Sequence, residues 1–458
     1  MKQLILIVGA GVAGIALAKN YPPELIVGFL DDVVEKNGIN ILGKLADINQ
    51  VVKKYKVTDI FFCIPSASGR VIREFINSID DQTVKLSILP RSIKTIVKKS
   101  VNISELTDVD FLNLIGREPV KHDVMEIKNF IKGKKVLVTG AAGSIGSRLV
   151  KLIAQNLNPA LVVCVDWWEN GTFFLEQDLK DKKNVIFKIA DIKNEKKLDL
   201  IFNEFKPDIV FHAAAYKHVP LMQSNPIEAF NNNVWGSLNI MQMAIKHQCQ
   251  NFVYVSTDKA VNPVNVMGST KRIGEMLLES LASTQSKTKL TAVRFGNVIQ
   301  SNGSVLEIFK RQIDKGEPLT VTHKDVTRYF MTIEEASQLI IQSALLGQSG
   351  EIFLLDMGEP IKIIDLAKSI IKLSNQPIKI KIVGLRPGEK LFEELSFNPK
   401  TMGKTNNSKI FIVKNEKEYI YKEFFKTIEK ILNKSLSYQL TDEEMITKLI
   451  NFGFQIKK

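Results

Sequence analysis

A short polar run, residues 256–259, directly follows the apolar stretch 251–255 near the middle of the chain. Within this run, Asp258 stands next to Lys259. An acid beside a base suits an elimination, because one group protonates a leaving hydroxyl while the other removes a proton from carbon. The same two side chains could instead form an ordinary exposed loop pair. The presence of Lys271 farther along the chain favours the catalytic interpretation.

Lys271 follows Met267 by four residues, and a helix places residues at this spacing on one face. Methionine has no proton to transfer, so it cannot act as the partner acid or base of this lysine. Met267 by itself therefore indicates plain packing or a decayed active site. The polar run at 256–259 follows a predicted strand, where α/β proteins place their sites, and it favours a working site.

The elements that must position these residues alternate between apolar strands and helical segments. This order predicts an α/β fold with two Rossmann-like, doubly wound parallel sheets. In the second of these two predicted sheets, strand 136–139 leads into a glycine-rich turn and a helix, and such a helix N-terminus is a ready site for a pyrophosphate. The residues of this predicted cofactor loop are Gly140, Gly143, Ser144, Ile145 and Gly146.

The next strand, 161–165, ends at Asp166. A carboxylate there accepts hydrogen bonds from a free ribose diol and repels a 2′-phosphate, which favours NAD over NADP. Residues 189–191 end a third strand, and Asp191 is expected to face the adenine. Ile192, the next residue, is also a predicted cofactor-binding residue. Small residues at the end of a fourth strand, 209–214, would let the cofactor lie close to the backbone; they are Ala213, Ala214 and Ala215.

The chain opens with a similar pattern, in which strand 4–8 leads into GAGVAG and strand 25–30 ends in Asp31. This pattern predicts a Rossmann-like domain that either binds a nucleotide or has a structural or regulatory role. The predicted organisation is this domain at 1–115, a linker and short helix at 116–133, an NAD-binding and catalytic domain with a substrate lobe at 134–400, and a helical tail at 401–458. In the tail, 419–432 has the pattern of an amphipathic helix, and Thr441 is the predicted N-cap of another.

The composition is that of a globular protein, with 45% hydrophobic and 24% charged residues among 458. The 62 Lys and Arg against 49 Asp and Glu give a net charge of +13. The lysines are scattered and outnumber the arginines that base and phosphate recognition prefers, which argues against nucleic-acid binding. A diffuse attraction to anionic membrane surfaces or phosphorylated substrates fits this charge better.

The three cysteines are widely spaced and form no CxxC, which excludes a disulfide framework and a cysteine zinc site and suits a reducing cytosol. No His, Cys and Asp cluster has metal-ligand spacing, so no metal is expected. The longest uncharged apolar run, 3–18, is shorter than a membrane span and could imitate a signal peptide, but its glycines favour a first Rossmann-like strand. A cytoplasmic protein, at most near the inner face of a membrane, is predicted.

Several strings in order from residue 116 to about 397 resemble one family: GREPV, VLVTGAAGSIGS, FHAAAYKHVPLM, NPIEAFNNNVWGSLN, VSTDKAVNP, MGSTKR, VRFGNV, VTHKDVTRYFMT and LRPGEKLFEEL. The sequence resembles the large nucleotide-sugar 4,6-dehydratases of bacterial polysaccharide and glycan biosynthesis, within the extended short-chain dehydrogenase/reductase superfamily. Its N-terminal domain resembles the extra domain that these large members carry.

The resemblance implies a mechanism in which hydride passes from carbon 4 of the sugar to NAD+ and returns to carbon 6. Between these steps, Lys259 would remove the carbon 5 proton and Asp258 would protonate the departing 6-hydroxyl. Thr257 would bind the 4-hydroxyl, and Lys271 would orient the nicotinamide. How the 4-hydroxyl loses its proton without a tyrosine is open; Asp258 acting through Thr257, or a water molecule, is one hypothesis.

Met267 stands where a smaller branch of the family has tyrosine, and it implies the large branch that retains configuration at carbon 5. The implied substrate is UDP-N-acetylglucosamine. Arg294 and Arg328 fit structural ion pairs as well as ligand contacts, while Asn297 should meet the diphosphate and Arg386 a phosphate or ribose. The expected substrate-binding residues are Lys217, Asn297, Arg328, Arg386 and Glu389. A homo-oligomer, a dimer by analogy, is implied.

The sequence departs from the family pattern in three places. Large members usually begin with transmembrane helices, whereas this chain starts at the first Rossmann-like domain, as either a soluble form or a soluble piece. Gln223 and Arg148 each replace a usual glutamate. Two other functions remain open. A nucleotide-sugar 4-epimerase would normally keep the tyrosine and lack the pair Asp258 and Lys259, and a non-catalytic NAD-binding regulator would not need Lys271.

Overall fold

The computed structural model describes residues 3–33, 38–81, 83–89, 114–115, 124–285, 287–299, 301–374, 376–396, 402–413, 421–437 and 439–457. The chain divides into two compact units that are each built from separate stretches of sequence. Unit 1 comprises Met1–Glu118, Gly303–Thr327 and Ile361–Gly384, and unit 2 comprises Pro119–Asn302, Arg328–Pro360 and Leu385–Lys458. This division differs from the predicted boundaries, which placed both later segments of unit 1 in the catalytic domain.

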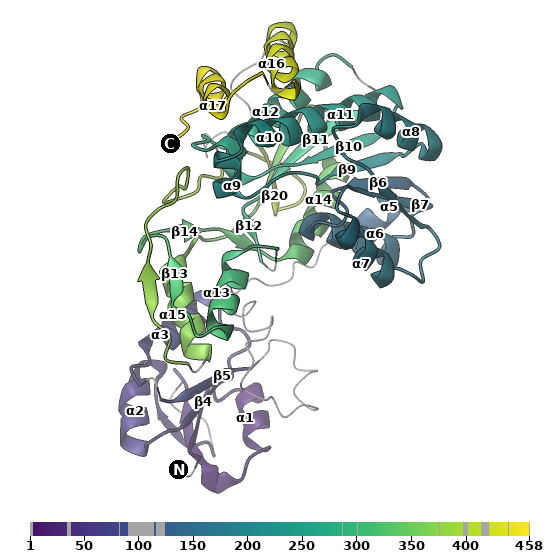
Figure 1. The fold of residues 1–458 in the computed structure, drawn as a ribbon. Helices are drawn as coiled ribbons and strands as arrows, with labels where there is room; N and C mark the ends of the chain where they lie inside the picture. Colours follow the sequence, from purple (N-terminus) through teal and green to yellow (C-terminus); the bar gives the residue numbers. More distant parts are fainter. Residues whose placement is uncertain are drawn as a thin grey trace. The chain divides into compact units, whose positions relative to one another are not determined.

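Unit 1 contains a five-stranded parallel sheet in the order β3-β2-β1-β4-β5. Figure 1 labels β4 and β5 of this sheet. Its central strand, β1 (Ile5–Val8), is buried at every position, as expected for a parallel sheet covered on both faces. The helix α15 (Ile363–Ser374) packs against α3 (Gly69–Ser78), although the two lie far apart in the sequence. The remaining elements are α1 (Val12–Ala18), η1 (Pro23–Leu25), β2 (Ile26–Leu30), β3 (Ile41–Gly43), η2 (Leu45–Asp47), α2 (Ile48–Tyr55), β4 (Asp59–Phe62), β5 (Lys85–Ile88), α13 (Val305–Asp314), β13 (Leu319–Val321), β17 (Ile361–Lys362) and β18 (Ile380–Ile382).

Unit 2 is organised around a nine-stranded sheet in the order β19-β20-β16-β11-β10-β9-β6-β7-β8. The strands from β16 to β8 are parallel, and β20 and β19 extend the sheet antiparallel at one edge. The strands of this sheet are β6 (Lys135–Thr139), β7 (Leu161–Asp166), β8 (Val185–Ile189), β9 (Ile209–His212), β10 (Asn251–Val255), β11 (Lys289–Arg294), β16 (Ile352–Leu355), β19 (Met402–Lys404) and β20 (Ile410–Val413). The order reverses between β6 and β9, and open α/β sheets bind ligands at such a point.

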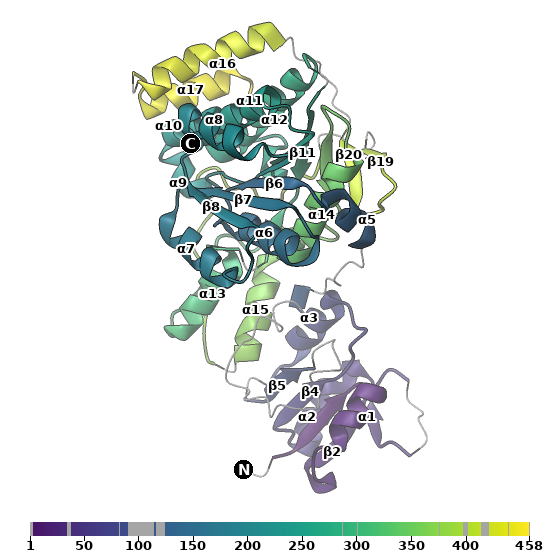
Figure 2. The ribbon, with the colours of Figure 1, turned by 90° about the vertical axis from the view of Figure 1, so that its right-hand side faces the viewer.

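Helices cover both faces of this sheet and form two apolar cores (Figure 2). One core is built with α8 (Glu195–Phe205), α10 (Pro226–Phe230), α11 (Ser237–Lys246), α12 (Val266–Ala282), α16 (Tyr421–Leu436) and α17 (Asp442–Asn451). The other is built with α5 (Val124–Ile131), α6 (Ser144–Asn156), α7 (Glu169–Asp178) and α14 (Ile333–Leu346). The short elements are α9 (Val219–Gln223), the π-helical turn η4 (Asn231–Gly236), η5 (Asp258–Ala260), β12 (Asn297–Val298), β14 (Thr327–Arg328) and β15 (Phe330–Met331). The predicted α/β fold with Rossmann-like parallel sheets is confirmed.

The turn between β6 and α6 shows why glycine is needed there. Gly140 has a φ of +65°, and a Cβ at this position would lie 2.6 Å from the backbone nitrogen of Ala214. A Cβ at Gly146 would lie 1.9 Å from the carbonyl oxygen of Gly140. The glycines therefore allow α6 to start directly behind the strand and to pack closely on it.

The tail of the chain forms two helices in unit 2. The helix predicted at 419–432 corresponds to α16, within the part of that range that the structure describes. Thr441 is the N-cap of α17, because its Oγ1 accepts from the Glu444 backbone N–H at 3.2 Å while Glu444 accepts from the Thr441 N–H at 2.8 Å. No helix among the described residues is long and apolar enough to cross a membrane.

Candidate active site

The polar run at 256–259 lies at the carboxyl end of β10, and η5 begins with Asp258. Asp258 is buried, and its Oδ1 accepts hydrogen bonds from Thr257 Oγ1 and from Lys259 Nζ, both at 2.9 Å. Its other oxygen, Oδ2, has no hydrogen-bond partner among the described residues. A Cβ at Gly296 would come within 3.0 Å of this oxygen, so the absence of a side chain at Gly296 leaves it room. The structure thus brings three of the five predicted catalytic residues, Thr257, Asp258 and Lys259, into direct contact.

Lys259 Nζ also donates to Asn297 Oδ1 at 3.2 Å and lies 3.7 Å from Glu393 Oε1. Burial lowers the pKa of this lysine, but the negative charges of Asp258 and Glu393 outweigh it and raise the pKa above its ordinary value. Lys259 is therefore charged at neutral pH when no substrate is bound. A lysine in this state must lose its proton before it can act as a base.

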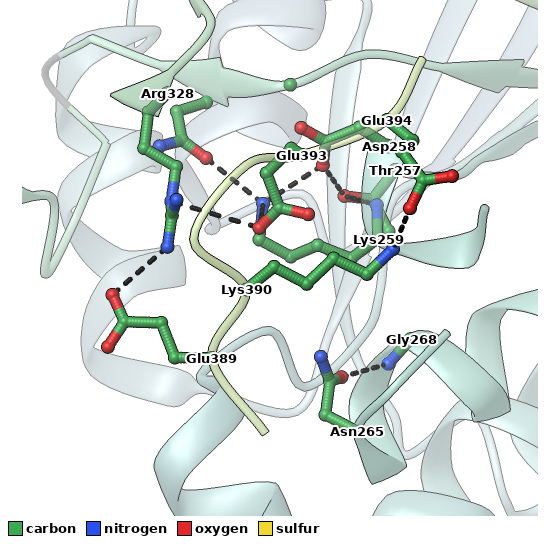
Figure 3. A network of polar contacts seen from close by, with 12 residues as sticks. Thr257, Asp258, Lys259, Asn265, Gly268, Arg328, Glu389, Lys390, Glu393 and Glu394 are labelled. Atoms are coloured by element: carbon green, nitrogen blue, oxygen red, sulfur yellow. Dashed lines mark hydrogen bonds and ion pairs between the residues drawn. The ribbon is translucent and has the colours of Figure 1, made fainter. Parts of the chain in front are cut away.

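The loop 385–396 brings Glu393 to this lysine (Figure 3). Gly388 has a φ of +74°, and its carbonyl oxygen accepts from Asn265 Nδ2 at 3.0 Å. Two residues after it, Lys390 Nζ donates to the carbonyl oxygen of Val261 at 3.0 Å. These contacts hold the loop against the segment that follows the catalytic strand.

Arg328 joins the same group of charges. Its Nη2 donates to Glu389 Oε1 at 3.0 Å, and its Nε lies 3.8 Å from Glu393 Oε1. The structure therefore places Arg328 and Glu389, both predicted substrate-binding residues, beside the catalytic pair. Arg386, from the same motif, has an exposed side chain and contacts Glu389 through its backbone N–H at 3.2 Å. Lys217 is likewise exposed.

Met267 and Lys271 lie on one buried face of α12, as their spacing predicts. The Nζ of Lys271 lies 3.8 Å from the centroid of the Tyr254 ring. Burial lowers the pKa of Lys271 to about 7, against the opposing negative charge of Glu275. Near neutral pH this lysine is therefore poised between its charged and neutral forms, whereas Lys259 is not.

A buried cluster of ion pairs around Glu275 holds α12 to the neighbouring strand β11. Glu275 accepts from Ser256 Oγ at 2.7 Å, from Arg294 Nε at 2.7 Å and Nη2 at 2.6 Å, and from Arg272 Nη1 at 3.0 Å. Burial alone would raise the pKa of Glu275, but the two arginines hold it at about 2. Arg294 is fully buried in this cluster, so its interpretation as a structural ion-pair former is the one that the structure supports.

The glycine loop and Asp166 form a cradle that suits a dinucleotide. Asp166 accepts from the Ala142 N–H through Oδ2 and from the Trp168 N–H through Oδ1, both at 2.9 Å, so it holds the loop at the end of β7. A Cβ at Gly143 would meet only the carbonyl oxygen of Gly140, at 3.2 Å, within 4 Å. The backbone at Gly143 is thus open to close approach, and the helix N-terminus behind it favours an anion. Ser144 Oγ accepts from the Asn302 N–H at 3.1 Å.

The other predicted cofactor residues differ in their exposure. Asp191 is half-buried, and its Oδ1 accepts from the Lys193 N–H at 2.8 Å. Ile192 is instead buried in the core, and Ile145 is half-buried. The half-buried residues Ala213, Ala214 and Ala215 directly follow β9 and thus lie at the switch point of the sheet. His212, at the end of β9, hydrogen-bonds through its ring to Thr139 at 2.6 Å and to Ser237 at 2.9 Å.

Sequence reasoning missed three residues of this site: Glu393, Tyr254 and Tyr329. Glu393 belongs to the motif LRPGEKLFEEL, but nothing local marks which of its glutamates faces Lys259. Tyr254 lies within β10, and its ring faces the ammonium group of Lys271. Burial, and then the charge of Asp258, raise the pKa of the Tyr329 phenol.

The two substitutions relative to the family pattern have structural partners in unit 2. Gln223 Oε1 accepts from the Val266 N–H at 3.1 Å, and its Nε2 donates to the carbonyl oxygen of Lys457 at 3.0 Å. It therefore links the start of α12 to the end of the chain. Arg148 lies 3.3 Å from Glu334. The GREPV string at 116–120 lies outside the described residues.

Residues 136–415, which include the whole site, match the family model described as polysaccharide biosynthesis protein. The chain belongs to this family. It is 42% identical over 415 residues to the capsular polysaccharide biosynthesis protein CapD of Staphylococcus aureus, covering 86% of this chain and 68% of the relative. It is also 42% identical over 407 residues to the probable polysaccharide biosynthesis protein EpsC of Bacillus subtilis, covering 85% of this chain and 68% of that protein. The predicted resemblance to polysaccharide biosynthesis proteins is confirmed.

Solved structures show the same fold. Pen from Bacillus thuringiensis is 32% identical with a TM-score of 0.59, covering 66% of this chain and 99% of its own. The dTDP-glucose 4,6-dehydratase DesIV of Streptomyces venezuelae, solved with NAD and TYD bound, has a TM-score of 0.53 at 20% identity, covering 57% of this chain and 88% of its own. UDP-glucose 4-epimerase of Thermus thermophilus in complex with NAD has a TM-score of 0.51 at 22% identity, covering 57% of this chain and 90% of its own. At these identities, the dehydratase and epimerase structures show that their fold is shared with this chain.

Proposed function

We propose that this protein is an NAD-dependent UDP-N-acetylglucosamine 4,6-dehydratase that retains configuration at carbon 5. The observation that carries the proposal is the buried Asp258 carboxylate, which contacts the Lys259 ammonium group and the Thr257 hydroxyl and keeps one oxygen without a hydrogen-bond partner among the described residues. An acid and a base joined in this way match the two proton transfers of a water elimination. Met267 supplies no proton, which supports the retaining branch.

NAD fits the cradle described above. Asp166 stands at the end of β7 for the adenosine ribose, and the loop from Gly140 to Gly146 offers backbone N–H groups to a pyrophosphate. Lys271, whose Nζ lies over the Tyr254 ring of the catalytic strand, is proposed to hold the nicotinamide ribose. When bound, NAD+ supplies the hydride acceptor and donor that the sugar chemistry requires.

The contact between Lys259 and Asp258 supplies both proton-transfer groups at once. If the ammonium proton crosses the 2.9 Å hydrogen bond, Lys259 becomes a neutral amine and Asp258 a carboxylic acid. The amine then takes the carbon 5 proton, and the acid gives its proton to the departing 6-hydroxyl, which leaves as water. Both groups end the elimination in the charge states in which they began. The product still needs a hydride at carbon 6 and a proton at carbon 5; Lys259 would return this proton, and the proton released from the 4-hydroxyl during oxidation would restore the pair.

The substrate-binding assignments follow the same geometry. Asn297 and Arg328 lie within one network with Lys259, and Glu389 anchors Arg328 in it. We propose that the UDP diphosphate is bound by Asn297, Arg328 and the exposed side chains of Lys217 and Arg386. Arginine binds phosphate in a two-point geometry, which orients the sugar as well as attracting it.

The decisive experiment is to incubate the protein with UDP-N-acetylglucosamine and NAD+ in D2O and to follow the sugar by NMR. We expect a UDP-linked 4-keto-6-deoxy product with deuterium at carbon 5 and unchanged configuration there. Formation of a galacto product would establish a 4-epimerase instead. Unchanged substrate would support the non-catalytic alternative.

The role of Asp258 can be tested in the same assay. We expect Asp258→Asn to lower turnover by at least about 100-fold, since a positioned general acid contributes on that scale. Asp178→Asn, on the exposed end of α7, serves as the matched control and should leave turnover unchanged. Full activity in Asp258→Asn would contradict the acid role.

A further inference from the structure

Glu393 has a buried carboxylate that contacts Lys259 and Arg328 as ion pairs. Its side chain is 4% exposed, and its Oε1 lies 3.7 Å from Lys259 Nζ and 3.8 Å from Arg328 Nε (Figure 3). Its Oε2 has no hydrogen-bond partner among the described residues. Burying a carboxylate in this way is costly unless nearby charges compensate it. Glu393 thus occupies a position that folding alone does not favour.

The loop contacts that hold this position do not involve the Glu393 side chain. Gly388 is fixed to Asn265, and Lys390 to Val261. The neighbouring Glu394 accepts from Asn262 at 2.6 Å and from Lys390 at 3.0 Å, and its side chain is about half exposed. The loop is therefore anchored on both sides of Glu393, which leaves the Glu393 carboxylate available for another role.

The charged groups that face Lys259 come from three segments. Asp258, in the same segment, and Glu393, from the loop 385–396, both favour the ammonium form, whereas Arg328 from β14 disfavours it. Asn297 contributes a neutral acceptor at 3.2 Å. Asp258 is the group that must receive the lysine proton in the proposed reaction, so Glu393 is the remaining counter-charge that can act on Lys259 throughout the cycle.

We propose that Glu393 is a positioning residue that holds the Lys259 ammonium group beside Asp258 and sets the point at which this group gives up its proton. Arg328, whose Nε lies 3.8 Å from Glu393 Oε1, completes the arrangement. The inference rests on the proposed function for its link to turnover, but the effect of Glu393 on Lys259 does not depend on the identity of the substrate. Two measurements therefore separate the two ideas.

The first measurement follows the reactivity of Lys259 itself. The intact protein is acetylated with a trace of acetic anhydride across a pH series, and modification of Lys259 is quantified by mass spectrometry. Only the neutral amine reacts, so the midpoint reports the loss of its proton. We expect Glu393→Gln to move this midpoint to lower pH by about one unit, because one negative neighbour is removed. Glu204→Gln, at an exposed position of α8, is the control and should leave the midpoint in place.

The second measurement is the pH dependence of turnover of UDP-N-acetylglucosamine. The descending limb, on which the proton that Lys259 passes to Asp258 is lost to solvent, should move to lower pH in Glu393→Gln and stay in place in Glu204→Gln. Glu393→Asp keeps the charge and should restore the wild-type limb. It also serves as the second variant if Glu393→Gln does not fold.

The outcomes are distinct. An unshifted labelling midpoint in Glu393→Gln, with wild-type turnover of the sugar by the parent protein, overturns the role of Glu393 and leaves the dehydratase proposal standing. A shifted midpoint in a protein that does not convert the sugar supports the role of Glu393 and overturns the dehydratase proposal. A uniform fall in turnover at every pH, with no shift of either midpoint, would show a merely structural role and would overturn the inference.

Discussion

At the scale of single residues, the two lysines of the site differ because of their neighbours. Lys259 has two carboxylates close to its ammonium group, which outweigh burial and keep it charged. Lys271 lies over the face of the Tyr254 ring, and a ring compensates a buried charge by only roughly 1–2 kcal/mol. Burial therefore dominates at Lys271, and the pKa falls to about 7. Two lysines twelve positions apart are thus suited to different tasks.

This difference predicts how stability depends on pH. The folded-state pKa of Lys271 is lowered, so between about 7 and the ordinary value of 10.5 the unfolded chain binds more protons at this residue than the folded protein does. The resulting penalty is complete at pH 7 and shrinks as the pH rises toward 10. We expect Lys271→Met to raise the midpoint of thermal unfolding at pH 7 and to lose this advantage toward pH 10.

Calorimetry of the variant and its parent at both pH values checks this expectation. Lys289→Met, at an exposed position of β11, is the control and should show no comparable dependence on pH. An advantage of Lys271→Met that is the same at pH 7 and pH 10 would mean that Lys271 does not release its proton in this range.

At the scale of elements, α12 joins the chemistry to the core. Met267, Lys271 and Glu275 follow one another at four-residue intervals on one face, and Asn265 caps the helix by accepting from the Gly268 N–H at 2.7 Å. Glu275 ties the middle of the helix to Arg294 on β11. Lys271 lies between these two contacts, so the cap before it and the ion pair after it both fix its position.

We expect Glu275→Gln to lower the free energy of unfolding by roughly 3–5 kcal/mol, because it leaves buried arginine charge without its carboxylate. Glu204→Gln breaks an exposed pair with Lys188 and should cost less than about 1 kcal/mol. Urea unfolding of both variants measures the difference. Equal losses in the two variants would show that the buried cluster contributes no more than a surface pair.

The strand, glycine turn and helix of each unit could be predicted from sequence because their requirements are local. Gly140 adopts a positive φ, and Gly146 sits where no side chain fits, so the residue types themselves reveal the turn. The N-cap at Thr441 was predictable for the same reason. The contact between Glu393 and Lys259 was not, because it depends on how the loop 385–396 packs against a segment more than a hundred residues earlier.

At the scale of the whole molecule, each unit buries at least one cysteine. Cys63 lies in unit 1, and Cys164 and Cys249 lie in unit 2. Burial raises the pKa of the Cys63 and Cys249 thiols to about 12 and also raises that of Cys164. The three thiols should therefore resist thiol-specific reagents in the native protein.

We expect no labelling by dithionitrobenzoate at pH 8 in the native state and labelling of all three thiols in strong denaturant. If the units unfold separately, Cys63 should become reactive at a different urea concentration from Cys164 and Cys249. Mass spectrometry after labelling at each concentration resolves the three sites. Labelling of any of them without denaturant would contradict their burial.

The discontinuous make-up of unit 1 has a consequence for the newly made chain. The strands β1 to β5 are synthesised before the unit 2 sheet, but α15, which packs on α3 and places Ser369 against Asn77 at 3.3 Å, is synthesised only after most of that sheet. At about 5–20 residues per second the interval is on the order of tens of seconds. Throughout it, the first sheet exists without the helix that completes its unit. The nascent protein therefore exposes part of its first core for longer than a domain encoded in one piece would.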